Sequence, residues 1–221
     1  SRDIFAVATD PEIDILVELI GGTDTALELV LTAIKNGKHI VTAHKSLIAE
    51  PGNDIFQAAH QTGADVAFEA AVAGGIPILK SLGEGLAANH INWVAGIING
   101  TGNYILTEME QGGRAFQEVL EEAQSLGYAE ADPTFDVEGV DAAHKLTIIA
   151  SIAFGIPLQF SKVYMEGISR ITVEDVKSAA QFGYRIKHLG IAKDTGHGIE
   201  LRVHPTLIPR ETMLSAVNGV M

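Results

Sequence analysis

The chain has 221 residues, of which 47% are hydrophobic and 19% charged, as in a folded globular protein. It has no cysteine, which excludes disulfide bonds, thiolate metal sites and thiol nucleophiles. The formal net charge of -13 disfavours nucleic acid and anionic lipid as partners, and neither a leader nor a membrane-spanning apolar run is recognisable, so we expect a cytoplasmic protein that handles small molecules or associates with proteins.

The first part of the chain alternates short apolar runs with amphipathic segments. Strands are predicted at Ile13–Leu19, His39–Thr42 and Ala64–Phe68. One helix is predicted after Gly21-Gly22-Thr23-Asp24, capped by Thr23 or Asp24, and another at Ile55–Thr62. Strands that alternate with such helices pair in parallel through right-handed crossovers. Residues 1–80 are therefore predicted to be the later half of a Rossmann-like, doubly wound parallel sheet.

The glycine-rich phosphate loop of nucleotide-binding sheets, G-x-G-x-x-G, does not occur in this sequence. In such folds this turn brings backbone amides against the pyrophosphate at a helix N-terminus. Two interpretations remain open: the chain is a fragment of a longer protein, or the domain binds no dinucleotide.

Residues 81–221 are predicted to form a second, incomplete α+β domain with a mixed sheet. The predicted elements from the junction onward are a helix at Ile78–Leu86, a strand at Ile91–Ile98, helices at Tyr104–Met109 and Phe116–Leu126, a polar loop at Ala129–Glu138, a helix through Leu146 and Ile152, and a hairpin of Lys187–Ala192 with Ile199–Val203. Gly112-Gly113, Gly127 and the turn at residues 195–198 are the expected breaks.

The densest polar patch covers residues 127–145 and holds five carboxylates and one lysine. Asp141 and Lys145 are four residues apart, so on a helix their side chains would share one face. The carboxylate would orient the ammonium, and a lysine held in this way can exchange a proton with a substrate oxygen. The carboxylates that could receive a substrate ammonium are Glu130, Asp132 and Asp136.

Each piece of this patch also has a structural interpretation. A helical Asp-x-x-x-Lys pair is commonly a solvated ion pair worth roughly a few tenths of a kcal/mol. Asp132-Pro133 is typical of a turn, and Asp136 could be a helix cap. A divalent-metal hydrolase site built on Glu130, Asp132 and Asp136 is a further alternative, although no histidine joins them at a useful spacing.

Five blocks, in order along the chain, together resemble the homoserine dehydrogenases. They are Glu18–Gly22, Gly37–Lys45, Glu69–Pro77, Gly96–Ile105 and the segment 127–145, which reads Gly-Tyr-x-Glu and then Asp-Pro-x-x-Asp-hydrophobic-x-Gly-x-Asp-x-x-x-Lys. Two departures occur: His44 replaces the Asn of the family's Thr-Ala-Asn-Lys segment, and Gly102 stands where the family often has Thr.

The resemblance implies an oxidoreductase that interconverts L-homoserine and L-aspartate 4-semialdehyde with NAD or NADP, in the biosynthesis of threonine, methionine and isoleucine. It implies that Lys145 and Lys45 lie near the reacting oxygen, that Asp141 and Glu130 position substrate and lysine, and that Asp136 binds the substrate amine. A homodimer is usual for the family, and the hairpin could supply an edge.

The resemblance also implies residues for the cofactor and for an ion. Nicotinamide and substrate would meet at Gly100 and Thr101, and the cofactor contacts would be Gly22, Thr23, Lys45 and Gly100. The backbone carbonyls of Glu69, Val72, Gly74 and Ile76 would hold a sodium ion, which needs only oxygen ligands.

A different class of function stays open because the phosphate loop is missing. The chain could be a truncated, catalytically silent domain that serves self-association or small-ligand binding. Five histidines have no ligand-like spacing and are interpreted as ordinary surface or core residues: His60, His90, His188, His197 and His204. His144 is expected to flank the Asp141–Lys145 face.

Overall fold

The computed structural model describes residues 3–220, which form two compact units. One unit consists of Ser1–Ile91 with Thr147–Phe160, and the other of Asn92–Leu146 with Ser161–Met221. The late segment belongs to the first unit partly because Asn53 holds it: its Nδ2 donates to the carbonyl of Leu158 at 2.9 Å, and its Oδ1 accepts from the amide of Leu158 at 3.2 Å. The predicted division at residue 80, into a nucleotide-binding part and a catalytic part, stays a prediction.

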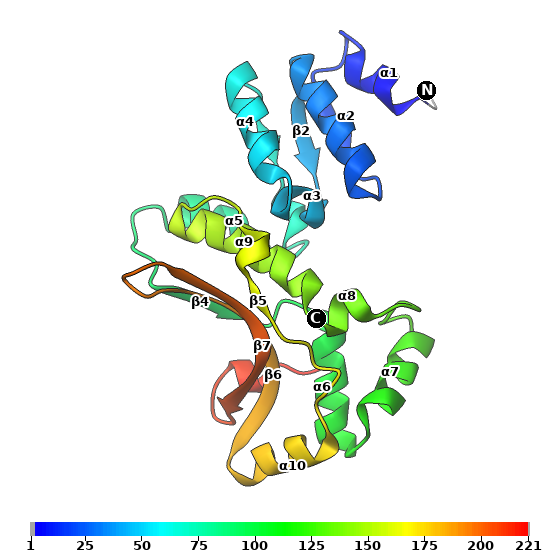
Figure 1. Cartoon of the computed structure of the whole chain (residues 1–221), viewed down its shortest axis with the longest axis vertical. Helices are drawn as coiled ribbons and strands as arrows, with labels where there is room; N and C mark the ends of the chain where they lie inside the picture. Colours follow the sequence, from blue (N-terminus) through cyan, green and yellow to red (C-terminus); the bar gives the residue numbers. More distant parts are fainter. Residues whose placement is uncertain (1–2, 221) are drawn as a thin grey trace. The chain divides into compact units, whose positions relative to one another are not determined.

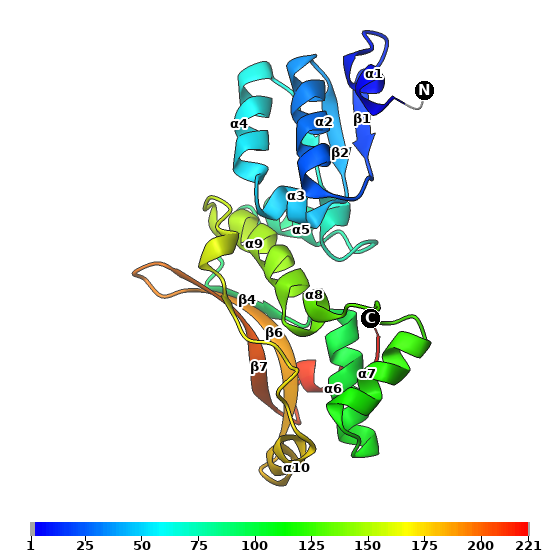
Figure 2. The same ribbon diagram turned by 45° about the vertical axis from the view of Figure 1, so that its right-hand side comes forward.

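The first unit contains the predicted parallel sheet, in the order β1-β2-β3. Strand β2 is labelled in Figure 1, and β1 and β2 are labelled in Figure 2. Its strands are β1 (Ile15–Glu18), β2 (His39–Thr42) and β3 (Val66–Ala67). Helices α2 (Thr23–Lys35) and α4 (Gly52–Thr62) form the crossovers. This is the later part of a doubly wound arrangement, and the predicted fold class is confirmed.

Helix α2 packs one face into the core of this unit. Its buried side chains meet those of the strands, and the core includes Leu16, Leu29, Val30, Ile34, Ile40 and Leu47. The helix is capped by Gly22, at φ 86, and not by Thr23 or Asp24 as the sequence predicted. A positive φ is accessible to glycine at little cost, so Gly22 can turn the chain sharply from β1 into α2.

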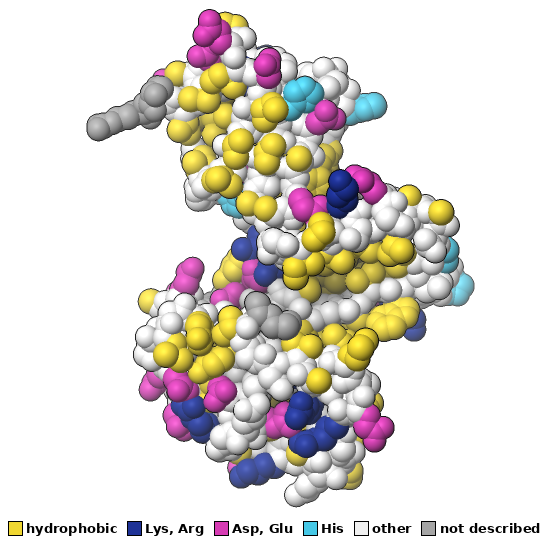
Figure 3. All heavy atoms as spheres, turned by 180° about the vertical axis from the view of Figure 1, so that it is seen from behind, with side chains coloured by type: hydrophobic (Ala, Val, Ile, Leu, Met, Phe, Trp, Pro, Cys, Tyr) yellow, Lys and Arg dark blue, Asp and Glu magenta, His cyan; other side chains and the backbone are white. Residues whose placement is uncertain are grey.

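Short helices of the first unit lie where none was predicted, namely α1 (Ile4–Thr9) and α3 (Lys45–Ala49). The predicted helix at 78–86 is split into α5 (Ile78–Lys80) and the π-helical turn η2 (Ser81–Gly85), and a 3-10 turn, η1 (Glu69–Ala71), precedes it. Hydrophobic side chains gather on the face of this unit seen in the upper part of Figure 3. The exposed apolar residues of β1 and β2 are Ile15, Val17 and Val41.

The second unit contains the predicted mixed sheet, whose strand order is β4-β6-β7-β5. Its strands are β4 (Trp93–Gly96), β5 (Tyr164–Met165), β6 (Tyr184–Asp194) and β7 (Ile199–Pro209). Among the described strands of this sheet, β5 and β7 pair in parallel, whereas β4 with β6 and β6 with β7 pair antiparallel. The hairpin is longer than predicted, since β6 and β7 pair from Tyr184 with Pro209 to Asp194 with Ile199. Pro205 and Pro209 lie beyond residues 202 and 203, where β7 pairs with β5, at an edge position that tolerates proline.

Five helices accompany this sheet: α6 (Gly100–Gly112), α7 (Phe116–Ser125), α8 (Thr134–Val137), α9 (Val140–Phe154), which continues into the first unit, and α10 (Val173–Gln181). The prediction that α6 begins near Tyr104 is wrong, because Asn99 caps the helix and it begins at Gly100. The predicted polar loop contains α8, and α10 was not predicted. The later part of the chain also has two 3-10 turns, η3 (Phe160–Lys162) and η4 (Leu214–Ala216).

Within residues 3–220, no helix has the length and apolar character needed to cross a membrane.

Candidate active site

The acid and the amine predicted on one helix face are in contact at the start of α9. Lys145 Nζ donates to Asp141 Oδ2 at 2.6 Å and to the carbonyl oxygen of Ile98 at 2.9 Å. The side chain of Asp141 is 6% exposed and that of Lys145 is 21% exposed. Burial makes this pair different from a solvated surface pair, because a charge removed from water must be compensated by its partner.

Asn99 joins this pair to a second carboxylate. Its Nδ2 donates to Asp141 Oδ2 at 2.9 Å and to Asp136 Oδ1 at 2.7 Å. Its Oδ1 accepts from the amide of Gly102 at 2.7 Å and so caps α6. One side-chain amide therefore contacts Asp136, the Asp141–Lys145 pair and the first turn of α6.

A tight corner between α8 and α9 keeps Asp136 and Asp141 close. Gly139 lies in this corner at φ 86, and a Cβ added there would lie 2.9 Å from Cγ1 of Val203 and 3.1 Å from Cε1 of His188. The corner is thus packed against β6 and β7. Larger residues at position 139 would be strained both by the backbone and by these neighbours.

The other residues predicted around this cluster are placed differently. Thr101 is buried, and its hydroxyl donates to the carbonyl of Tyr128 at 2.8 Å, so its remaining polar capacity toward a ligand is that of an acceptor. Gly100 is the first residue of α6. Glu130 is exposed in the loop before α8, where its backbone carbonyl accepts from Gln124.

Asp132 has the structural role considered for it. Its carboxylate accepts from the amide of Thr134 at 3.1 Å, and hydrogen bonds from Thr134 hold the pKa of Asp132 below its ordinary value. Over residues 3–220, no group of three or more Asp, Glu or His side chains is arranged to hold a metal ion. The divalent-metal alternative therefore has no support from the geometry.

In the first unit, the residues predicted for the cofactor lie at the carboxyl ends of β1 and β2. Gly22 caps α2 without a side-chain hydrogen bond, and a Cβ added to it would meet nothing within 4 Å. Lys45 begins α3 directly after His44. Glu18 is buried and accepts from the hydroxyl of Thr42 at 2.6 Å, and His44 Nδ1 lies 3.6 Å from the other carboxylate oxygen.

The residues predicted for a sodium ion lie in a turn before α5. Ala73 has φ 48, a left-handed conformation that costs an alanine roughly 1 kcal/mol or more. The carbonyl of Ile76 accepts from the amide of Ile78 at 2.7 Å. The carboxylate of Glu69 accepts from the amides of Leu79 and Lys80, both at 2.9 Å, so this side chain caps α5.

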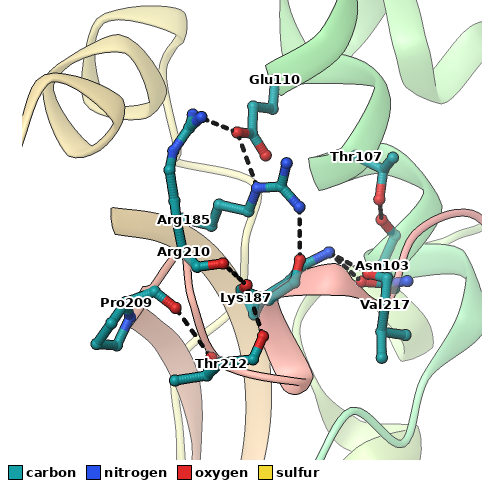
Figure 4. Close-up of polar contacts among 10 residues, drawn as sticks. Asn103, Thr107, Glu110, Arg185, Lys187, Pro209, Arg210, Thr212 and Val217 are labelled. Carbon is teal, nitrogen blue, oxygen red and sulfur yellow. Dashed lines mark hydrogen bonds and ion pairs between the residues drawn. The ribbon is translucent and has the colours of Figure 1, made fainter. Parts of the chain in front are cut away.

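A second polar cluster, around Lys187 on β6, was not expected from the sequence (Figure 4). Lys187 is 1% exposed, and its Nζ donates to Asn103 Oδ1 at 3.0 Å and to the carbonyl of Val217. Burial, and to a lesser extent the neighbouring Arg185, lowers the pKa of Lys187 to about 8. A lysine in a strand is expected at the surface, because lysines are rarely this buried, so the residue type alone did not indicate a buried site.

Comparisons with known proteins agree over the whole chain. A profile for homoserine dehydrogenase matches residues 77–221, and a profile for the homoserine dehydrogenase NAD binding domain matches residues 1–69. A homoserine dehydrogenase of Pseudomonas aeruginosa is 68% identical over 221 residues, which are 100% of this chain and 51% of that protein. The chain spans about half the length of the curated relatives it matches.

Solved structures are similar as well. The crystal structure of a homoserine dehydrogenase from Thiobacillus denitrificans is 64% identical, with a TM-score of 0.98 over 100% of this chain and 51% of that one. A hyperthermophilic archaeal homoserine dehydrogenase in complex with NADPH is 25% identical, with a TM-score of 0.83 over 98% of this chain and 62% of that one.

Proposed function

The chain belongs to the homoserine dehydrogenase family, and from this membership we propose that the protein interconverts L-homoserine and L-aspartate 4-semialdehyde. The observation that carries the proposal is the hydrogen-bonded cluster of Asp136, Asn99, Asp141 and Lys145, in which Asn99 and Asp141 are buried and the other two are half-buried. It offers a carboxylate for an ammonium group and, next to it, the amine of Lys145 for an oxygen. L-Homoserine has an ammonium group on its Cα atom and a hydroxyl group on the last carbon of its side chain.

In this proposal, Lys145 is the proton carrier. In the oxidation direction, the neutral form of its amine accepts the proton of the substrate hydroxyl and becomes an ammonium, as the carbon that bears this hydroxyl loses a hydride to the cofactor. Asp141 accepts from Lys145 at 2.6 Å, so it orients the amine and stabilises the ammonium that forms. Asp136 binds the substrate amine, and Lys45 and Glu130 complete the set that the family resemblance implies.

The proposed cofactor is NAD or NADP, which accepts the hydride when bound. Gly22 and Thr23, at the start of α2, would contact it. The fit is supported by the open space over Gly22 and by the lack of a side-chain cap, which leaves the amides of the first turn of α2 for an acceptor group of the cofactor. Lys45 and Gly100 are proposed as further contacts.

A sodium ion is proposed at the carbonyls of Glu69, Val72, Gly74 and Ile76. The left-handed Ala73 within this turn supports the proposal, because strained backbone is often retained where carbonyls must converge on a ligand. A homodimer is proposed as the assembly, with β7 beyond residue 203 as an available sheet edge.

The function is tested with the full-length protein, by following reduction of NAD or NADP in the presence of L-homoserine. Reduction that depends on L-homoserine is the expected result, and its absence with both cofactors would overturn the proposal. The role of Asp136 is tested by Asp136→Asn, which removes the charge that the substrate amine requires. We expect KM for L-homoserine to rise roughly tenfold or more, and an unchanged KM would contradict this role.

A further inference from the structure

Asn99 has a bonding pattern that helix capping alone does not require. The cap needs only Oδ1, which accepts from the amide of Gly102. The Nδ2 group points the other way, and its hydrogen bonds go to Asp136 and Asp141 at 2.7 and 2.9 Å. In the proposed function, Asp136 binds the substrate amine, and Asp141 orients the lysine that faces the substrate hydroxyl.

The bridge is also costly to break. Asn99 is 7% exposed and Asp141 is 4% exposed, so water is poorly placed to replace a lost donor. A buried charged acceptor that loses its donor carries the full cost of desolvation. Two carboxylates that lie close together repel each other, and a shared neutral donor holds them together without adding charge.

The backbone beside Asn99 takes part in the same arrangement. Ile98, the preceding residue, provides the carbonyl that accepts from Lys145 at 2.9 Å. The segment 98–99 therefore holds Lys145 through its backbone, and Asp141 and Asp136 through its side chain. It lies between β4 and α6, two regular elements, so its freedom to move is small.

We infer that Asn99 is a positioning residue that sets the separation between Asp136 and the Asp141–Lys145 pair, and thereby the length of the amino alcohol that the protein accepts. The inference rests on the proposed function. An amine bound at Asp136 and a hydroxyl held at Lys145 must be spanned by the carbon chain of the substrate. When Asn99 no longer links the two carboxylates, this span is no longer fixed.

The test compares Asn99→Ser with the wild type in the full-length protein. Serine is as good a helix cap as asparagine, but its short hydroxyl cannot donate to both carboxylates. Asn99→Asp is the second variant, since it keeps the shape of the side chain and removes the donors. Thr172→Ala is the matched control, because it removes the side-chain cap of α10, where Thr172 accepts from the amide of Asp175.

The substrates compared are L-homoserine, L-serine, which is one methylene shorter, and L-5-hydroxynorvaline, which is one methylene longer. In Asn99→Ser we expect kcat/KM for L-homoserine to fall roughly tenfold to hundredfold, the loss typical of a hydrogen bond to a charged group. The preference for L-homoserine over the longer compound should fall about tenfold as well, and the control should keep the wild-type preference.

Two outcomes overturn the inference. One is an unchanged preference in both Asn99 variants, which includes an equal loss of kcat/KM for all three substrates. The other is failure of both variants to fold, which would give Asn99 a role in stability alone. The proposed function fails separately, if the wild type does not oxidise L-homoserine at all. A narrowed gap between L-homoserine and the longer compound in either folded variant supports the inference.

Discussion

Lys145 and Lys187 are two lysines of the same unit whose surroundings differ in charge. Lys145 donates to a carboxylate and a backbone carbonyl, whereas both hydrogen-bond partners of Lys187 in the described part of the chain are neutral oxygens. Lys187 is also the more deeply buried, and its pKa is lowered to about 8. The comparison separates a charge that a carboxylate compensates, at a candidate active site, from a buried amine whose hydrogen-bond partners are neutral and whose charge is costly to bury.

Helix α6 connects the two lysines. Asn99 caps it beside Lys145, and Asn103, one turn later, accepts from Lys187. Asn103 also donates to the carbonyl of Gly219 at 2.8 Å, and the amide of Gly219 donates to the hydroxyl of Thr107 at 3.3 Å. The first two turns of α6 are therefore fixed by the candidate site on one side and by the segment around Gly219 on the other.

The largest effect is expected from Asp141→Asn, which removes the charge that compensates Lys145. We expect kcat for L-homoserine oxidation by the full-length protein to fall at least roughly hundredfold, because the amine loses its orienting carboxylate. Asp132→Asn is the matched control, since Asp132 makes only a local turn. A rate within about threefold of the wild type would remove Asp141 from the mechanism.

The second effect concerns the pH dependence of stability at Lys187. Its pKa is about 8 in the folded protein and near 10.5 when unfolded, so between these values the unfolded chain binds the extra proton. The cost of burying the charge is therefore fully present below pH 8 and disappears as the pH rises to 10.5. It corresponds to about 3 kcal/mol.

The check is denaturant unfolding of the wild type and of Lys187→Met across this range of pH. Methionine has a similar length and no proton to lose, so the variant corrects for all other titrating groups. We expect the free energy of unfolding of the wild type to gain on that of Lys187→Met as the pH rises from 8 to 10.5. If the free energies of unfolding of the two proteins changed with pH in parallel, burial would not have lowered the pKa of Lys187.

The smallest effect is expected at Glu110, which lies beside the Lys187 cluster (Figure 4). Its carboxylate accepts from Arg185 at 3.1 Å and from Arg210 at 2.6 Å. These groups are partly exposed, so Glu110→Gln should lower the free energy of unfolding by about 1 kcal/mol. A loss of about 3 kcal/mol, as large as the cost of burying the Lys187 charge, would mean that the ion pairs of Glu110 dominate the energetics of this cluster.

Periodicity and spacing were enough to predict the parallel sheet, the hairpin and the contact of Asp141 with Lys145. These features depend on local patterns, namely strand runs, turn residues and the four-residue spacing on a helix. Two elements were not predicted: β5, which has two residues, and α10, whose local signal is the capping box of Thr172 and Asp175.

The bridging role of Asn99 could not be predicted, because it depends on residues 37 and 42 positions away. Its role as the N-cap of α6 is predictable from the sequence, because asparagine is a preferred N-cap residue and Gly100 begins the helix. Burial of Lys187 follows from tertiary packing against α6, which no spacing in β6 reveals. Local rules thus predicted the elements, and long-range contacts decided what the side chains do.

The central claim is that Lys145 takes part in the chemistry, while Lys187 is a buried amine outside it that links β6 to α6 and to Val217. It is tested most directly by measuring kcat for L-homoserine with full-length Lys145→Met and Lys187→Met, each corrected for its folded fraction. We expect Lys145→Met to lose at least roughly a hundredfold and Lys187→Met to stay within about threefold of the wild type. Near-normal turnover in folded Lys145→Met would contradict the account.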